Sequence, residues 1–302
     1  MNQFINKPCS LITALLLFIS FLPASAQQEN DRSLLWQVTG QALKEPSYLF
    51  GTYHLLTDKF TATLPEINTP FTKAKGVVVE MVIDSSHLAA MGAMAIMPDK
   101  KISELMNPDE FALVSSEVEK VVGANMTALN QFKPVSIMVI MTMMYAQQKN
   151  AEILKKYAGT PMDYYFAVSG KKSGKVVTPL ETQAEQAQLL YDAYPISEQA
   201  RQLVEFVKQK DLAAKTQVDL VNLYLAKDLH GMYTLMEKMP QEFGNSDFLL
   251  KDRNLKWMKV LPDLMTNESQ FIAVGALHLA GPDGLITLLR QRGYSVTPVT
   301  HK

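Results

Sequence analysis

The chain has 302 residues, a net charge of −1 and a single cysteine. Because 29 Lys and Arg oppose 30 Asp and Glu, the chain offers no strong basic field, and nucleic acid is not an expected partner. The lone cysteine, Cys9, excludes a disulfide framework and a thiolate metal site.

The chain opens with the three regions of a secretory signal peptide. Lys7 and the amino terminus supply positive charge, residues 11–22 are apolar, and residues 24–26, Ala-Ser-Ala, form a small-x-small cleavage site. We therefore expect residues 1–26 to be removed and the mature protein to be exported to a periplasm or secreted. The apolar run is too short for a stable membrane span, although an amino-terminal anchor helix is the alternative.

Residues 27–302 are expected to form one domain, which opens with a hairpin of strands at 34–39 and 47–54. A helix at 64–75 follows, and then the apolar, β-branched run 77–83, which is typical of a buried strand. This order of strand, helix and strand indicates an α/β fold.

Residues 86–265 are predicted to be mostly helical. Residues 134–148 are strongly apolar, but the segment is shorter than a membrane span, so a buried helix is expected. A lone strand is predicted at 175–180, and one long helix at 248–265. The 17 methionines, several at helical spacing, are interpreted as core packing rather than as a copper site.

The chain closes with a strand at 271–277, a helix at 282–290 and a strand at 294–299. Since strands lie near both chain ends, the expected fold class is α/β. The mixed central sheet is built from both ends of the chain, with a large helical insertion over about residues 86–265.

Two Gly-x-x-His motifs lie at opposite ends of the domain, at Gly51–His54 and Gly275–His278. Each follows an apolar strand-like run, and Glu80 follows three valines in the same way. One such motif alone is common by chance. If the three strands are parallel neighbours, however, their carboxyl ends share the edge where open α/β sheets bind ligands. Two histidines and a glutamate, with positions left for water, form a ligand set for a catalytic divalent metal ion.

Glu80 has an alternative role, because a carboxylate within an apolar strand is costly unless it is paired or metal-bound. Arg253 is the candidate ion-pair partner, and it could instead stabilise an oxyanion or lie exposed on its helix. Glu181 and Asp163 are candidate general bases or supports for a metal ligand. A helix-capping role is the alternative for each of these two carboxylates.

These residues resemble the TraB/GumN family, which includes bacterial GumN-like proteins, pheromone-shutdown proteins and the animal Tiki proteases. The family is marked by two Gly-x-x-His motifs with a glutamate and an arginine between them, here Glu80 and Arg253. The resemblance covers about residues 34–299. Other stretches that resemble family segments are Ser47–Thr52, Lys133-Pro134, Asp163 with its helix, Leu180–Thr182 with Gln186, Arg253-Asn254 and Gly293-Tyr294.

The resemblance implies an α/β core related to erythromycin-esterase-like and haem-binding ChaN-like folds. For the Tiki proteases it implies metal-dependent proteolysis, with manganese or cobalt favoured. The leading interpretation of this chain is an exported metal-dependent hydrolase, and more narrowly a peptidase, acting on a peptide or small-molecule substrate. His54, Glu80 and His278 would hold the ion, which would activate a water molecule. Manganese, iron, cobalt and zinc all suit these ligands.

The alternative function is a non-catalytic periplasmic protein that binds a metal ion, a haem or a peptide in the same cleft. A haem would need an axial ligand facing an apolar slot, such as Tyr53 or His54. The sequence leaves the oligomeric state open.

The signal-peptide interpretation predicts that the exported protein begins at or near Gln27. Mass spectrometry of the protein recovered from the periplasm or the medium measures this amino terminus directly. A protein that still begins at Met1 would show that the segment is retained, and Cys9 would then remain in the exported chain.

Overall fold

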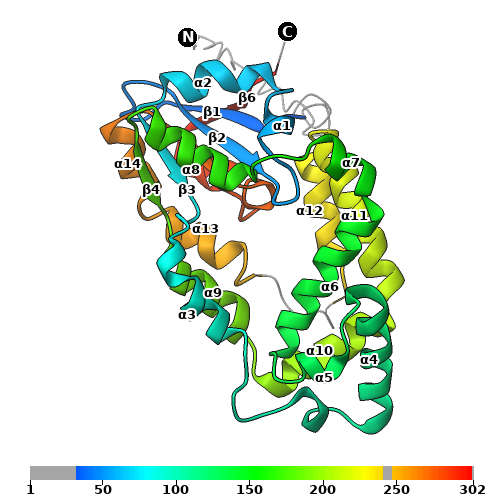
Figure 1. Cartoon of the computed structure of the whole chain (residues 1–302). Coiled ribbons are helices and arrows are strands. Elements are labelled where there is room, and N and C mark those ends of the chain that lie inside the picture. Colours follow the sequence, from blue (N-terminus) through cyan, green and yellow to red (C-terminus); the bar gives the residue numbers. More distant parts are fainter. Residues whose placement is uncertain (1–31, 241–246, 301–302) are drawn as a thin grey trace, which may run out of the picture. The chain divides into compact units, whose positions relative to one another are not determined.

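A computed structural model describes residues 32–240 and 247–300 (Figure 1). The expected signal peptide, residues 1–26, lies outside the described residues. The described part contains a six-stranded sheet in the order β4-β3-β5-β2-β1-β6. Its strands are β1 (Leu35–Thr39), β2 (Ser47–Thr52), β3 (Gly76–Val79), β4 (Val176–Pro179), β5 (Gln270–Gly275) and β6 (Ser295–Pro298).

The sheet is mixed and combines strands from both ends of the chain, as the sequence predicted. Strands β2, β5, β3 and β4 run parallel to one another, and β1 pairs antiparallel with β2 and β6. Thr52 of β2 is level with Gly275 of β5, and Val79 of β3 is level with Ala273. The carboxyl ends of the parallel strands therefore meet at one edge, which positions the segments that follow them.

Helices account for most of the remaining chain. The α-helices are α1 (Asp58–Thr61), α2 (Asn68–Lys73), α3 (Leu88–Met94), α4 (Pro108–Val122), α5 (Met126–Leu129), α6 (Pro134–Lys149), α7 (Ala151–Lys156), α8 (Met162–Lys172), α9 (Gln183–Asp192), α10 (Ile196–Lys208), α11 (Lys210–Leu225), α12 (Leu229–Glu237), α13 (Lys251–Trp257), α14 (Leu261–Asn267) and α15 (Leu285–Gln291). Short 3-10 turns are η2 (Pro65–Ile67), η3 (Ser85–His87), η4 (Ile102–Glu104) and η6 (Ala276–His278).

Aromatic side chains join α2 and α8 to one face of the sheet. The ring of Phe166 in α8 lies 5.2 Å from the ring of Phe50 and 5.1 Å from that of Phe271. Phe71 in α2 packs edge-on against Phe271, with 5.2 Å between ring centres. Such buried aromatic contacts bring dispersion and hydrophobic stabilisation together. They also hold α8, which carries Asp163, against the parallel strands.

The helical insertion has a second hydrophobic core of its own. Helix α6 lies side by side with α4, α10 and α11 (Figure 1). The buried side chains of Ile137 and Met141 in α6 share this core with Val118 of α4 and Leu203 of α10. The apolar segment 134–148 therefore forms a helix of this bundle. In the part of the chain that the structure describes, no helix combines the length and apolar character needed to cross a bilayer.

The strand predicted at 77–83 is shorter than expected and ends at Val79. Beyond it, the carbonyl oxygen of Glu80 accepts hydrogen bonds from the backbone N–H groups of Leu180 and Glu181. This local arrangement ends the regular ladder and turns the chain away from the sheet. Glu80 therefore stands at the tip of the strand rather than inside it.

Other predicted boundaries also differ from the structure: the strand expected at 47–54 ends at Thr52, and the helix expected at 64–75 is divided into η2 and α2. The strand expected at 271–277 ends at Gly275, and His278 lies in the 3-10 turn that follows. The helix expected at 248–265 is split into α13 and α14, because Pro262 lies in the first turn of α14, where its missing N–H costs nothing.

Candidate active site

Segments that follow the parallel strands bring the predicted site residues to one edge of the sheet. His54 lies just beyond β2 and Glu80 directly follows β3. Glu181 lies just beyond β4, and His278 closes the turn after β5. Arg253 reaches the same edge from α13, where it joins Glu80, Glu181 and His278 in one buried cluster.

The guanidinium of Arg253 is the centre of this cluster. Its Nη2 lies 2.5 Å from Glu80 Oε2, and its Nε lies 3.0 Å from Glu181 Oε2. Its Nη1 lies 2.9 Å from His278 Nε2 and 3.1 Å from the carbonyl oxygen of Leu249. Only 11% of the Arg253 side chain is exposed. The oxyanion role suggested for Arg253 stays a prediction, and it would require one of these N–H groups to change partner.

Glu181 is enclosed by hydrogen-bond donors and has no exposed side-chain surface. Its Oε1 accepts from the Trp257 indole N–H at 3.1 Å, and its Oε2 accepts from Gln186 at 3.3 Å as well as from Arg253. A carboxylate with these partners holds the guanidinium in place. The general-base role suggested for Glu181 stays a prediction.

Glu80 is aimed into the cluster by a backbone donor. The Gly275 N–H donates to Glu80 Oε1 at 2.7 Å. A Cβ atom at Gly275 would lie 3.1 Å from that oxygen, so glycine permits the close approach. At the other motif, a Cβ atom at Gly51 would lie 3.0 Å from the Cα atom of Ala276. The two motif glycines therefore allow close packing at the edge that carries the histidines.

Asn254 determines which ring nitrogen of His278 carries the proton. The side-chain amide of Asn254 donates to the carbonyl oxygens of His278 and Asp283, so its Oδ1 faces His278 Nδ1 at 2.8 Å as an acceptor. His278 therefore carries its proton on Nδ1, and its Nε2 accepts from Arg253. Burial and the Arg253 charge lower the pKa of His278 to about 4 despite the nearby Glu80, so the ring is neutral at pH 7.

The ionised state of Glu80 depends on the cations around it. Burial opposes ionisation, but His278 and Arg253 outweigh it and lower the pKa of Glu80 to about 2. Because His278 is neutral at pH 7, Arg253 is the cation that stabilises the carboxylate there. Burial disfavours the charged form of Arg253 in turn, and the carboxylates of Glu80 and Glu181 prevail and raise its pKa.

His54 forms a separate pair with Asp163 at the same edge. Its Nδ1 lies 2.8 Å from Asp163 Oδ2, and the Thr52 hydroxyl donates to Asp163 Oδ1 at 2.5 Å. The hydrogen bond to Asp163 raises the pKa of His54 to about 9. The charges of Glu80 and Arg253 also act on this pKa, so the pair lies within electrostatic reach of the cluster. The His54 side chain is 76% exposed, which leaves its Nε2 edge accessible.

Three residues of the site were not predicted as functional. Asn254 orients His278, Trp257 donates to Glu181, and Gln186 bridges Glu80 and Glu181. Asn254 and Gln186 stood out only as parts of stretches that resemble the family. Trp257 lies one helical turn after Arg253, a spacing that places the two side chains on one face of α13.

The described residues do not by themselves form the three-ligand metal site that the sequence predicts. Glu80 Oε1 lies 3.8 Å from His278 Nε2, and an unprotonated Nε2 suits a metal ligand. Arg253, however, contacts both side chains. Within residues 32–240 and 247–300, no group of three or more His, Cys, Asp or Glu side chains is placed to share an ion. The divalent ion therefore stays a prediction for this chain.

Comparison with known proteins adds one finding. The model of the TraB/PrgY/gumN family matches residues 34–298, a range that runs from β1 to β6 and includes every site residue described above. No curated protein and no solved structure matches the chain.

The buried Arg253 pair predicts a stability effect of Glu80→Gln. Glu80→Gln removes one of the two carboxylates that bond to Arg253. Because Glu181 remains as its partner, we expect the free energy of unfolding to fall by about 2 kcal/mol in metal-free buffer, the loss of one charged hydrogen bond. Urea unfolding in the presence of a chelator measures this change. Glu205→Gln removes a carboxylate from an exposed pair with Lys208 and should cost less than about 1 kcal/mol. Unchanged or raised stability in Glu80→Gln would contradict the pairing with Arg253. It would indicate that Glu80 is an unpaired carboxylate in the metal-free protein and is stabilised only when a cation binds.

The His54–Asp163 pair predicts a pH effect of known sign. The pKa of His54 in the folded protein, about 9, lies above its ordinary value of 6.5. The pair therefore contributes its full stabilisation below pH 6.5 and loses it as the pH rises through 9. An NMR titration of the His54 ring in the metal-free protein measures the pKa, and Asp163→Asn should move it down toward 6.5. A wild-type ring that already titrates near 6.5 would contradict the pairing.

Proposed function

The chain belongs to the TraB/PrgY/gumN family, and on that premise we propose that it is an exported hydrolase that cleaves peptide bonds. The main support is the combination of an accessible His54 held by Asp163 with a buried cluster around Arg253. Paired titratable groups whose pKa values are pushed apart are characteristic of catalytic sites. In this site one histidine is cationic at pH 7 and the other is neutral.

His54 is the proposed proton donor. With a pKa of about 9 it is protonated at pH 7, and Asp163 holds its Nδ1 at 2.8 Å. The Nε2–H is then available to protonate the leaving nitrogen when the peptide bond breaks. Asp163 acts through His54 by fixing the orientation of the ring, in the manner of a carboxylate that orients a catalytic histidine.

Arg253 is proposed to stabilise the oxyanion that forms during peptide cleavage. Glu181 fixes the guanidinium in place through its Nε. The N–H groups that bond to Glu80 and His278 would supply positive charge where an oxyanion develops, once an ion takes those two side chains. Glu181 is fully enclosed, so it acts by positioning Arg253 rather than by touching substrate.

In the proposed mechanism, a divalent ion would supply the nucleophile, a water molecule. Neither Glu80, with a pKa of about 2, nor His278, with a pKa of about 4, is a strong base at pH 7. Glu80 and His278 would hold the ion in place of Arg253. His54, which the sequence suggests as a further ligand, keeps the proton-donor role here, because its Nε2 cannot carry a proton and bind an ion at the same time. When bound, manganese, iron, cobalt or zinc would acidify a water molecule.

A non-catalytic binding protein is the second candidate. It is favoured by the internal network, in which each guanidinium nitrogen of Arg253 already has a hydrogen-bond partner. A haem on Tyr53 finds less support. The Tyr53 ring stacks on Tyr224 at 5.0 Å, and burial raises its pKa to about 12.

The proposal is tested with protein purified from the exported fraction, a set of fluorogenic peptides and elemental analysis. We expect peptide hydrolysis that a chelator abolishes, and a loss of kcat of about 10²–10⁴-fold in His54→Ala. His87→Ala, an exposed histidine near Asp84, should keep full activity. Bound metal in the wild type that is lost in Glu80→Gln would support the ion site. Absence of turnover with all four metals, alongside measurable peptide binding, would favour the binding protein.

A further inference from the structure

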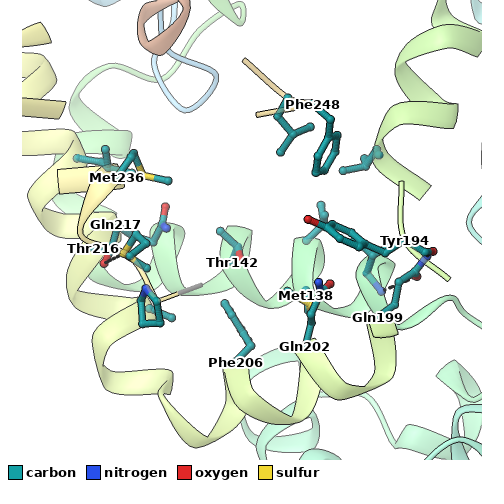
Figure 2. Close-up of a pocket in the computed structure, with 18 of the residues that line it drawn as sticks. Met138, Thr142, Tyr194, Gln199, Gln202, Phe206, Thr216, Gln217, Met236 and Phe248 are labelled. Carbon is teal, nitrogen blue, oxygen red and sulfur yellow. Dashed lines mark hydrogen bonds between the residues drawn. The ribbon is translucent and has the colours of Figure 1, made fainter. Parts of the chain in front are cut away.

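Helices of the insertion enclose a cavity of about 820 Å³ (Figure 2). Its wall is formed by α6, α9, α10, α11, α12 and the segment that precedes α13. The volume lies within the range of about 300–1,000 Å³ that is usual for ligand pockets. We refer to this cavity as the insertion pocket.

Helix α6 is apolar on two faces, and only one of them is explained by core packing. Ile137 and Met141 face the second hydrophobic core. Thr142 and Met143 line the insertion pocket, and Met138 both packs against the core and lines the pocket. A helix with one face in a core usually carries charged or polar residues on the opposite face. Met143 is 47% exposed, so apolar surface is left uncovered on this wall, as is typical of a binding site.

The lining of the pocket indicates what kind of ligand it suits. Four methionines contribute to the wall, and their flexible side chains adapt to irregular apolar ligands. The side chains of Thr142 and Gln217 also line it and form no hydrogen bond within the described part of the chain. Glu237 and Asp247 add negative charge, whereas no Lys or Arg among the described residues lines the pocket.

The pocket adjoins the candidate active site through the segment before α13. Phe248 lines the insertion pocket and also a neighbouring hollow whose wall includes Glu181 and Arg253. The ring of Phe248 packs edge-on against Tyr194, with 5.6 Å between ring centres. Leu249 lines the pocket too, and its carbonyl oxygen accepts a hydrogen bond from Arg253. The Phe248 side chain is therefore a wall common to the insertion pocket and to the hollow beside Arg253.

We propose that the insertion pocket binds an apolar, uncharged stretch of the peptide substrate beside the bond that is cleaved. This inference rests on the proposed hydrolase function and specifies its substrate class. Apolar side chains would cover the exposed surface of Met138 and Met143. The peptide groups between them would bond to Thr142 and Gln217, which can both donate and accept.

A fatty acid is the other apolar ligand of suitable size, and the pocket suits it less well. Its carboxylate would find no cation in the lining and would meet the charges of Glu237 and Asp247. An uncharged peptide avoids this cost and uses the polar groups that a hydrocarbon chain would leave unpaired.

The test measures binding separately from cleavage. The probe is a fluorescein-labelled hexapeptide of Leu, Met and Ala with acetylated and amidated ends, and its anisotropy is followed in a His54→Ala background to prevent turnover. Thr142→Trp fills the pocket, and Met143→Glu places a charge on its partly exposed wall. We expect each to raise Kd by about tenfold or more. Leu113→Trp adds the same ring at an exposed position of α4 outside the pocket and should bind like its parent. Circular dichroism and thermal melts confirm that each variant folds.

The outcomes separate this inference from the proposed function. If binding is equal in Thr142→Trp, Met143→Glu and the parent, or if dodecanamide binds and the peptide does not, the inference is overturned while hydrolysis is unaffected. If binding depends on the pocket but the protein with native His54 cleaves no peptide, the pocket assignment stands and the hydrolase fails. With native His54, a KM for the hexapeptide that rises in Thr142→Trp but not in Leu113→Trp, an exposed position outside the pocket, would support both.

Discussion

A buried arginine held by two carboxylates is the interaction on which the organisation of this site depends. Arg253 comes from α13, Glu80 from the end of β3 and Glu181 from the end of β4. An unpaired buried charge costs several kcal/mol, so the three segments are stabilised in the positions where both carboxylates contact the one guanidinium. The same guanidinium bonds to His278, which ties the end of β5 to this arrangement.

The two motif histidines are chemically different because their surroundings are different. Asp163 raises the pKa of His54 to about 9, whereas burial next to Arg253 lowers the pKa of His278 to about 4. Asn254 completes the contrast by holding the proton of His278 on Nδ1. One edge of the sheet therefore carries a cationic outer ring and a neutral inner ring. Separation of this kind allows one group to donate a proton while the other accepts a hydrogen bond or binds a cation.

Local hydrophobic patterns predicted most of the fold, because the spacing of apolar residues indicates which face of a helix or strand is buried. Apolar β-branched runs placed the parallel strands, and the apolar segment 134–148 was recognised as a buried helix, α6. Boundaries failed where long-range contacts end an element, as at Glu80, whose carbonyl bonds to the segment after β4. The second apolar face of α6 was equally visible in the sequence. Its exposure to a cavity was not, because that depends on how five other segments pack around it.

The sequence by itself determined the fold class, the sheet built from both chain ends and the residue types that gather at its edge. These follow from local periodicity and from the fact that parallel strands align their carboxyl ends. Only the tertiary structure decided which partner each charged group takes. A carboxylate at a strand end is stabilised by whichever cation the packing brings to it, and here that cation is Arg253, 173 residues away from Glu80 in the chain. The sequence alone does not identify this pair. Ion pairs between distant residues follow no periodic pattern, and each of the two charged side chains could equally pair with another residue.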